Sequence, residues 1–257
     1  MIHCESITDV YSKEKLALWF VAAFKSGFIN SAGFLISGKF VSHVTGFGTQ
    51  VGIAVGHSDY FFGAELLIIP FSFIFGGVVT SFILEDTKHK NTNPSYHYVQ
   101  ALITILIGVV IILGESSLLP DNVAFDQDQK YDFVEFVIIG LLCFICGLKN
   151  SLVTWATFGK IRVTHMTGNA TDVGLHLLSF ISPRHKESRL KENRYINIYR
   201  MGLIFSFSSG ALISAMVFPV IGYKSFLIVF VISLFVTFLT FYDNRRREAL
   251  SLLKRSF

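Results

Sequence analysis

Two lysines in apolar segments are the residues of this chain best suited to binding chemistry. Lys25 lies within a long apolar segment, residues 16–37, and Lys149 lies within another, residues 132–155. A charge inside a membrane-spanning segment is costly and usually faces the bundle interior or a water-filled cavity. The two lysines therefore predict a site for an anionic or polar group, with Asp172 as the candidate counter-ion. For Lys149 the alternative is snorkelling to a nearby interface.

A ten-residue pattern rich in small and polar residues occurs twice. Residues 43–52 read HVTGFGTQVG and residues 165–174 read HMTGNATDVG. Each predicts a short helix that starts at its Thr-Gly pair, where unpaired N–H groups and the positive dipole end attract anions. The alternative is that the small residues only allow close packing and the polar ones only cap the helix. The binding interpretation gives these candidates: Thr45, Gly46, Thr167, Gly168, Asn169 and Asp172.

Four more polar residues occupy corresponding places in the two parts of the chain. Asn30 and Asn150 are typical of a helix break, which would bring both side chains to the binding site. His43 and His165 open the two decapeptides and could gate the site or relay protons, because imidazole titrates near neutrality. A simple hydrogen-bonding role is the alternative for both. We find no catalytic set, metal-ligand spacing or cofactor motif, so we expect no enzyme, no metal and no cofactor.

The segments that position these residues are predicted to be membrane helices. Hydrophobic residues make up 52% of the chain and charged residues only 16%, against about a quarter charged in soluble domains. A helix of about 20 apolar residues crosses a bilayer. Two shorter segments, residues 44–57 and 166–180, accompany the long ones. The long segments are approximately residues 16–37, 62–84, 98–119, 132–155, 199–221 and 224–242.

An internal repeat relates the two halves, because Asn30-Ser31 aligns with Asn150-Ser151 and the decapeptides follow in the same order. Eight helices with parallel halves would result if the short segments span, and six with inverted halves if they only re-enter. The positive-inside rule favours six. We therefore expect an all-α polytopic membrane protein, 1–257, with six transmembrane helices as two inverted three-helix repeats. The repeats cover about 16–119 and 132–242, each with a short re-entrant or broken helix, and 243–257 is a basic cytoplasmic tail.

At these residues the chain resembles the YoaK-like family of bacterial inner-membrane proteins, whose domain is of unknown function. The resemblance covers roughly residues 15–240. One departure is Phe47, where the family pattern usually has Asn after Thr-Gly. The resemblance implies a multi-spanning protein of the cell inner membrane and a transporter-like role, without a substrate. The matching residues are Gly27, Asn30, Ser31, Thr45, Gly46, Asn150, Ser151, Thr167, Gly168 and Asn169.

The function that we expect is a transporter or facilitator of a small polar or anionic solute, with its site between the two inverted repeats. A passive channel is the alternative. A sensor or assembly protein without transport, or an intramembrane enzyme, fits less well. The expected partners are the lipid bilayer and the small-molecule solute, with no nucleic acid, and both termini are expected to be cytoplasmic.

Overall fold

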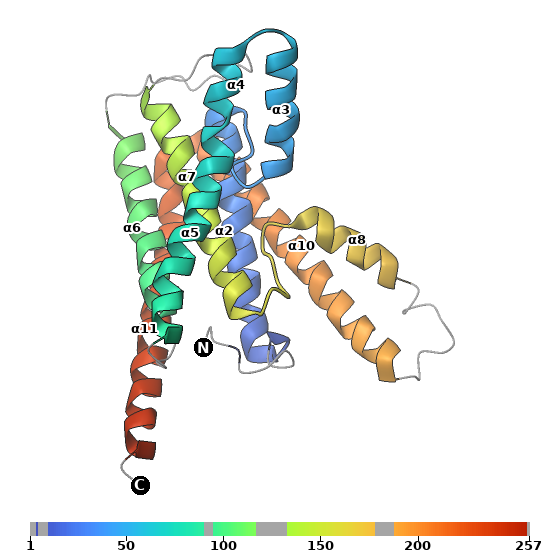
Figure 1. Ribbon diagram of the computed structural model, residues 1–257, viewed down its shortest axis with the longest axis vertical. Helices are drawn as coiled ribbons and strands as arrows, with labels where there is room; N and C mark the ends of the chain where they lie inside the picture. Colours follow the sequence, from blue (N-terminus) through green and yellow to red (C-terminus); the bar gives the residue numbers. More distant parts are fainter. Residues whose placement is uncertain (1–3, 5–9, 90–94, 117–132, 178–187, 256–257) are drawn as a thin grey trace.

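The computed structural model describes residue 4 and residues 10–89, 95–116, 133–177 and 188–255 (Figure 1). Parts of the predicted segments fall outside the described residues, namely residues 117–119, 132 and 178–180, as does the end of the tail, residues 256–257. The described residues contain helices and no strand. The helices are α2 (Lys13–Ser37), α3 (Val44–Gly56), α4 (Tyr60–Leu66), α5 (Ile68–His89), α6 (Tyr96–Gly114), α7 (Phe133–Ala156), α8 (Met166–His176), α10 (Ser188–Ile221), the 3-10 helix η1 (Gly222–Ser225) and α11 (Phe226–Arg255).

Several of these helices are long and apolar enough to cross a membrane. Five ranges meet that description: Lys15–Ser37, Tyr60–Glu85, Tyr96–Gly114, Phe133–Ala156 and Arg194–Arg247. The last range has 54 residues and contains both α10 and α11. Large apolar side chains on these helices are exposed, as lipid-facing residues are. The described residues therefore form an all-helical, multi-pass membrane protein.

The two decapeptides form short helices, α3 of 13 residues and α8 of 11 residues. At 1.5 Å per residue these helices are about 20 Å and 17 Å long, which is less than the hydrocarbon core of about 30 Å. Helix α3 stands beside α4, whereas α8 lies along α10 where that helix leaves the bundle (Figure 1). The short helices thus occupy different surroundings in the two halves.

The helix breaks expected at Asn30 and Asn150 are absent, because α2 continues to Ser37 and α7 to Ala156. Each asparagine side chain instead accepts hydrogen bonds from the loop that follows its helix. Asn30 Oδ1 accepts from Ser42 N at 3.1 Å and from Ser42 Oγ at 2.8 Å. Asn150 Oδ1 accepts from Thr164 Oγ1 at 3.2 Å. A side chain that bonds a distant segment does not compete with its own helix backbone, so both helices stay intact.

Four copies of a Phe-x-x-Gly sequence join the two halves. Residues 24–27 of α2 meet residues 207–210 of α10, and residues 144–147 of α7 meet residues 73–76 of α5. In each contact a Cβ added to either glycine would overlap the backbone of the facing phenylalanine. Small residues of this kind let membrane helices approach closely. The first long helix of each half therefore packs on the second long helix of the other half.

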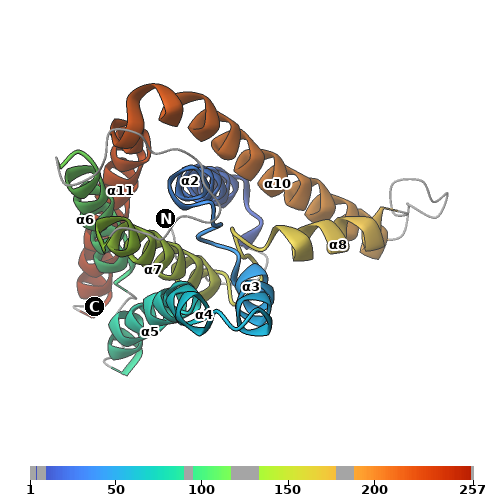
Figure 2. The ribbon, with the colours of Figure 1, turned by 90° about the horizontal axis from the view of Figure 1, so that it is seen from above.

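The remaining long helices complete the bundle around this pair of contacts. Helices α2 and α7 lie in the middle, with α10 on one side, α4 and α5 on another, and α6 beside α11 (Figure 2). The start of α2 and the end of α11 lie in the same, lower part of the molecule (Figure 1). The interior between α2, α6, α7 and α11 is where polar side chains from both halves meet.

Candidate functional site

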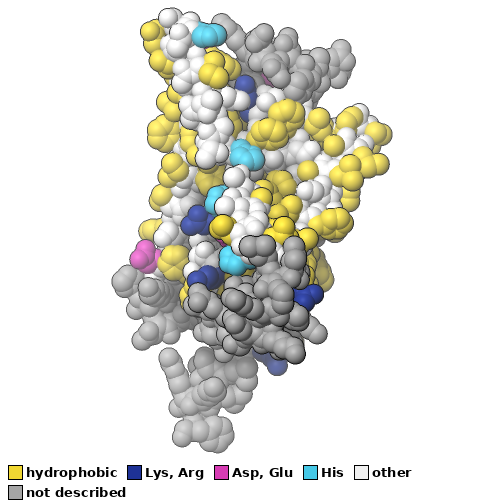
Figure 3. All heavy atoms as spheres, turned by 90° about the vertical axis from the view of Figure 1, so that its right-hand side faces the viewer, with side chains coloured by type: hydrophobic (Ala, Val, Ile, Leu, Met, Phe, Trp, Pro, Cys, Tyr) yellow, Lys and Arg dark blue, Asp and Glu magenta, His cyan; other side chains and the backbone are white. Residues whose placement is uncertain are grey.

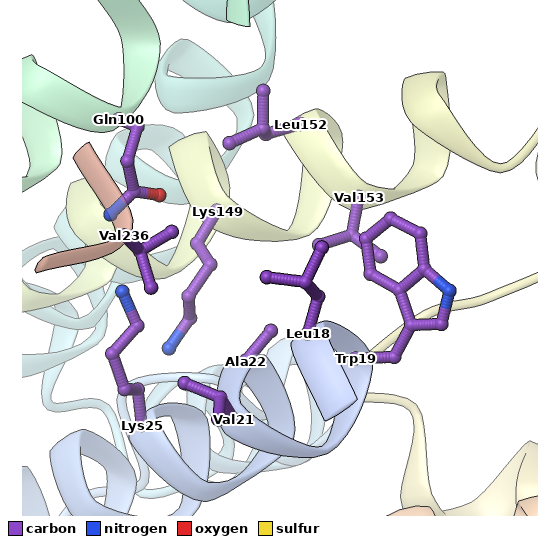
Figure 4. Close-up of a pocket in the computed structure, with 10 residues that line it drawn as sticks. All are labelled: Leu18, Trp19, Val21, Ala22, Lys25, Gln100, Lys149, Leu152, Val153 and Val236. Atoms are coloured by element: carbon purple, nitrogen blue, oxygen red, sulfur yellow. The ribbon is translucent and has the colours of Figure 1, made fainter. Parts of the chain in front are cut away.

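A small cavity of about 30 Å³ lies between α2, α6, α7 and α11. Lys25 of α2 and Lys149 of α7 both point into it, with Gln100 of α6 on its rim (Figure 4). Each lysine is only 2% exposed. No carboxylate is among the lining residues, which are Leu18, Trp19, Val21, Ala22, Lys25, Gln100, Lys149, Leu152, Val153 and Val236. The volume suffices for a water molecule or two, and two lysine side chains enter a lining that is otherwise mostly apolar.

Lys25 is held by a network of polar side chains between α6 and α11. Its Nζ donates to Ser233 Oγ at 3.2 Å, and Gln100 Nε2 donates to the same oxygen at 2.9 Å. Thr104 Oγ1 lies 3.0 Å from Ser233 Oγ and 2.9 Å from Thr237 Oγ1. Helix α6 belongs to the first half and α11 to the second. The network therefore ties the two halves together at the edge of the cavity.

Lys149 differs from Lys25, because its Nζ is buried without a hydrogen-bond partner among the described residues. A buried ammonium group without partner or counter-ion is strongly unfavourable. The like charge of Lys25 in the same cavity adds repulsion. An anion in the cavity would relieve both effects, so the unpartnered Nζ of Lys149 is the strongest indication of a ligand.

Asp172 is not the counter-ion of the two lysines, contrary to our expectation. Its Oδ2 lies 2.9 Å from a guanidinium nitrogen of Arg200. Asp172 belongs to α8, which packs on α10 away from the cavity. The separation of α8 from the bundle centre is the physical reason, and spacing along the chain did not reveal it.

The other candidates from the decapeptides also lie away from the cavity. Thr45, Gly46 and Thr167 are exposed, and Gly168 and Asn169 are half-buried. A Cβ at Gly168 would overlap the ring of His165, whereas a Cβ at Gly46 would meet nothing within 4 Å. Gly168, in the second decapeptide, therefore makes room for the ring of His165. Ligand binding by these five residues stays a prediction.

His43 and His165 each precede the first residue of a short helix without capping it through the side chain. The His43 ring lies 5.7 Å from the Phe40 ring. Histidine and basic side chains are visible on the face that carries α3 and α8 (Figure 3). Neither histidine lines the lysine cavity, so a gating or proton-relay role would act at a distance from it.

Sequence reasoning missed the polar partners of Lys25. Gln100 and Thr104 are four residues apart in an apolar run, and so are Ser233 and Thr237. Residues four apart lie on one face of a helix, so each pair marks a polar stripe that could have been recognised. That the two stripes face each other could not be read from the sequence, because 133 residues separate Gln100 from Ser233.

The comparisons with known proteins identify a family without assigning an activity. A family model described as "Protein of unknown function (DUF1275)" matches residues 18–239, most of the chain. Neither the curated proteins nor the solved structures contain a match. The matched range includes the lysine cavity, its polar network and both short helices.

Proposed function

The chain belongs to the DUF1275 family, and we propose that it carries a small anionic or polar solute across the cell inner membrane. In this proposal six helices cross the membrane as two inverted halves. The solute binds between the halves, at the cavity of Lys25 and Lys149. Broad support comes from a recurring transporter plan in which the site lies between inverted repeats.

The helix packing supports the six crossings. The range Arg194–Arg247 would be about 80 Å long as one helix, far more than one crossing needs. Counting it as two crossings brings the total to six and leaves both termini on one side. The reciprocal Phe-x-x-Gly contacts, α2 with α10 and α7 with α5, are what two halves related by a two-fold axis would make.

A labelling experiment tests this topology. Single cysteines at Lys160, in the loop after α7, and at Lys224, in η1, should react with a membrane-impermeant maleimide from opposite sides. We expect Lys160→Cys to be labelled from the cytoplasm and Lys224→Cys from outside. Labelling of both from one side would exclude the inverted arrangement.

The observation that carries the solute proposal is the pair of buried lysines, one from each half, that share a cavity without a carboxylate. Because the solute would contact both halves at once, a small relative movement of the halves could open the cavity to either side. A cavity of about 30 Å³ holds only a water molecule or two, so a solute could pass only after such a movement, and this favours a carrier over the alternative, a passive channel.

The test is an anion flux assay with purified protein in liposomes. Vesicles are placed in ammonium nitrate or ammonium phosphate, and swelling is followed by light scattering. Ammonia enters freely and takes up a proton inside, so the anion limits swelling. Proton-coupled uptake needs no protonophore, whereas a passive anion channel swells only when one is added.

Lys149→Gln and Lys25→Gln should each lower the swelling rate at least tenfold while the protein remains monodisperse in detergent. Lys160→Gln is the matched control, because it removes an equal charge from an exposed lysine. If both cavity variants swell as fast as the wild type, the solute binds elsewhere. If liposomes with the wild type swell no faster than empty liposomes in either ammonium salt, anion transport itself is contradicted.

A further inference from the structure

A second cavity, about 370 Å³ in volume, lies on another face of α7. Lys149, Leu152 and Val153 line the lysine cavity, whereas Asn150, Ser151, Thr154 and Trp155 line this second one. Its other walls are Gly77, Thr80 and Ser81 of α5 and Arg162 of the loop after α7. We call this space the α5–α7 groove.

The groove offers hydrogen-bond donors and a positive charge, and none of its lining residues is acidic. Asn150 uses its side-chain oxygen to accept from Thr164, so its amide N–H groups are the donors that remain for a ligand. Arg162 contributes a guanidinium group, which binds phosphate or carboxylate oxygens in pairs. Ser81 and Ser151 add hydroxyl groups. Such a set of donors suits an oxyanion.

The corresponding place in the first half carries two phenylalanine rings. In the repeat alignment, Phe34 occupies the position of Thr154, and Phe40 lies in the loop that corresponds to the loop with Arg162. Their rings stack at 4.4 Å between centroids. Phenylalanine rings offer no hydrogen-bond donors, so these two residues of the first half do not repeat the donor set of the groove.

The groove lies near one end of the candidate membrane span. Ser81 is one helical turn before Glu85, the last residue of the span Tyr60–Glu85, which corresponds to about 6 Å. Arginine and hydroxyl side chains at this depth meet lipid headgroups as well as solutes from the aqueous phase.

From the donor set, the charge and the depth we propose that the α5–α7 groove is a second binding site, for a phosphate-type oxyanion. Phospholipid headgroups and free phosphate share this chemistry. Arg162 binds the oxyanion, with Asn150 and Ser151 as further donors. This site is separate from the lysine cavity, so it does not depend on the proposed transport.

The two tryptophans of the chain allow the two sites to be followed separately, since Trp155 lines the groove and Trp19 lines the lysine cavity. Trp19→Phe leaves Trp155 as the reporter, and Trp155→Phe leaves Trp19. The protein is kept in maltoside detergent, which contains no phosphate. It is titrated with inorganic phosphate in one series and with short-chain phosphatidylglycerol in another, by fluorescence and by calorimetry.

We expect a saturable response of Trp155 to at least one probe, and the probe that saturates identifies the source of the oxyanion. Arg162→Gln should raise the Kd at least tenfold. Lys160→Gln, which removes a charge from the same loop, should change the Kd of the Trp155 response less than twofold. The proposal is overturned if neither probe saturates by either method, or if Lys160→Gln weakens binding as much as Arg162→Gln.

Discussion

Replacing Gly27 by alanine tests the helix packing that brings the two halves together. A Cβ at this position would overlap the backbone carbonyl of Phe207, so α2 and α10 would have to separate. Overpacking of a close contact typically costs 1–3 kcal/mol. We expect Gly27→Ala to lower the free energy of unfolding by about 2 kcal/mol, or about thirtyfold in the unfolding equilibrium constant.

Gly52→Ala is the matched control, because Gly52 is also a helical glycine but an added Cβ would meet nothing within 4 Å. Removing a glycine from a helix interior gains about 0.5–1 kcal/mol. Gly27→Ala should therefore lower the free energy of unfolding and Gly52→Ala should raise it, so that the two variants differ by about 3 kcal/mol.

The assay is reversible unfolding of the purified protein in mixed micelles with increasing dodecyl sulfate, followed by circular dichroism. Gly147→Ala, which occupies the corresponding place between α7 and α5, should behave like Gly27→Ala. If Gly27→Ala and Gly52→Ala have the same unfolding midpoint, the α2–α10 contact is not as close as described, and the reasoning from reciprocal packing fails.

Three further changes can be measured in the same unfolding assay. Lys149→Met removes an unpartnered buried charge, so we expect it to stabilise the protein by about 1–3 kcal/mol; destabilisation would mean that the ammonium has a partner. Asn30→Ala should cost about 2 kcal/mol, because the buried N–H and hydroxyl of Ser42 lose their acceptor; an unchanged midpoint would contradict this. Asp172→Asn should cost less than about 1 kcal/mol, since its ion pair with Arg200 is partly exposed; a larger loss would indicate a buried role.

The elements that follow from local pattern were predicted well. The short segment predicted over residues 44–57 is α3, Val44–Gly56, and the one over residues 166–180 is α8, which ends at His176. The long apolar segments are helices, although α10 begins at Ser188, earlier than the predicted residue 199. An apolar run long enough to span, and a glycine-rich pattern too short to do so, are properties of neighbouring residues.

The composition of the candidate site could be predicted only in part. Both lysines were expected to face one site, and the structure places them at one cavity. Asp172 was expected there too, but it pairs with Arg200. The asparagines were expected to break their helices, and they hold the following loops instead. In each case the residue type was informative, while its partner came from another segment.

By itself, the sequence determined that this protein is a helical membrane protein, with a ten-residue pattern that occurs twice and with charges that its apolar segments must bury. Hydrophobic length and the cost of a buried charge are local, so they can be read along the chain. Only the tertiary structure decided which groups meet. Gln100 and Ser233 lie 133 residues apart and Lys25 and Ser233 lie 208 apart, and such contacts depend on how whole helices pack. The glycine contacts of α2 with α10 and of α7 with α5 set that packing, and with it the cavity where the two lysines face each other.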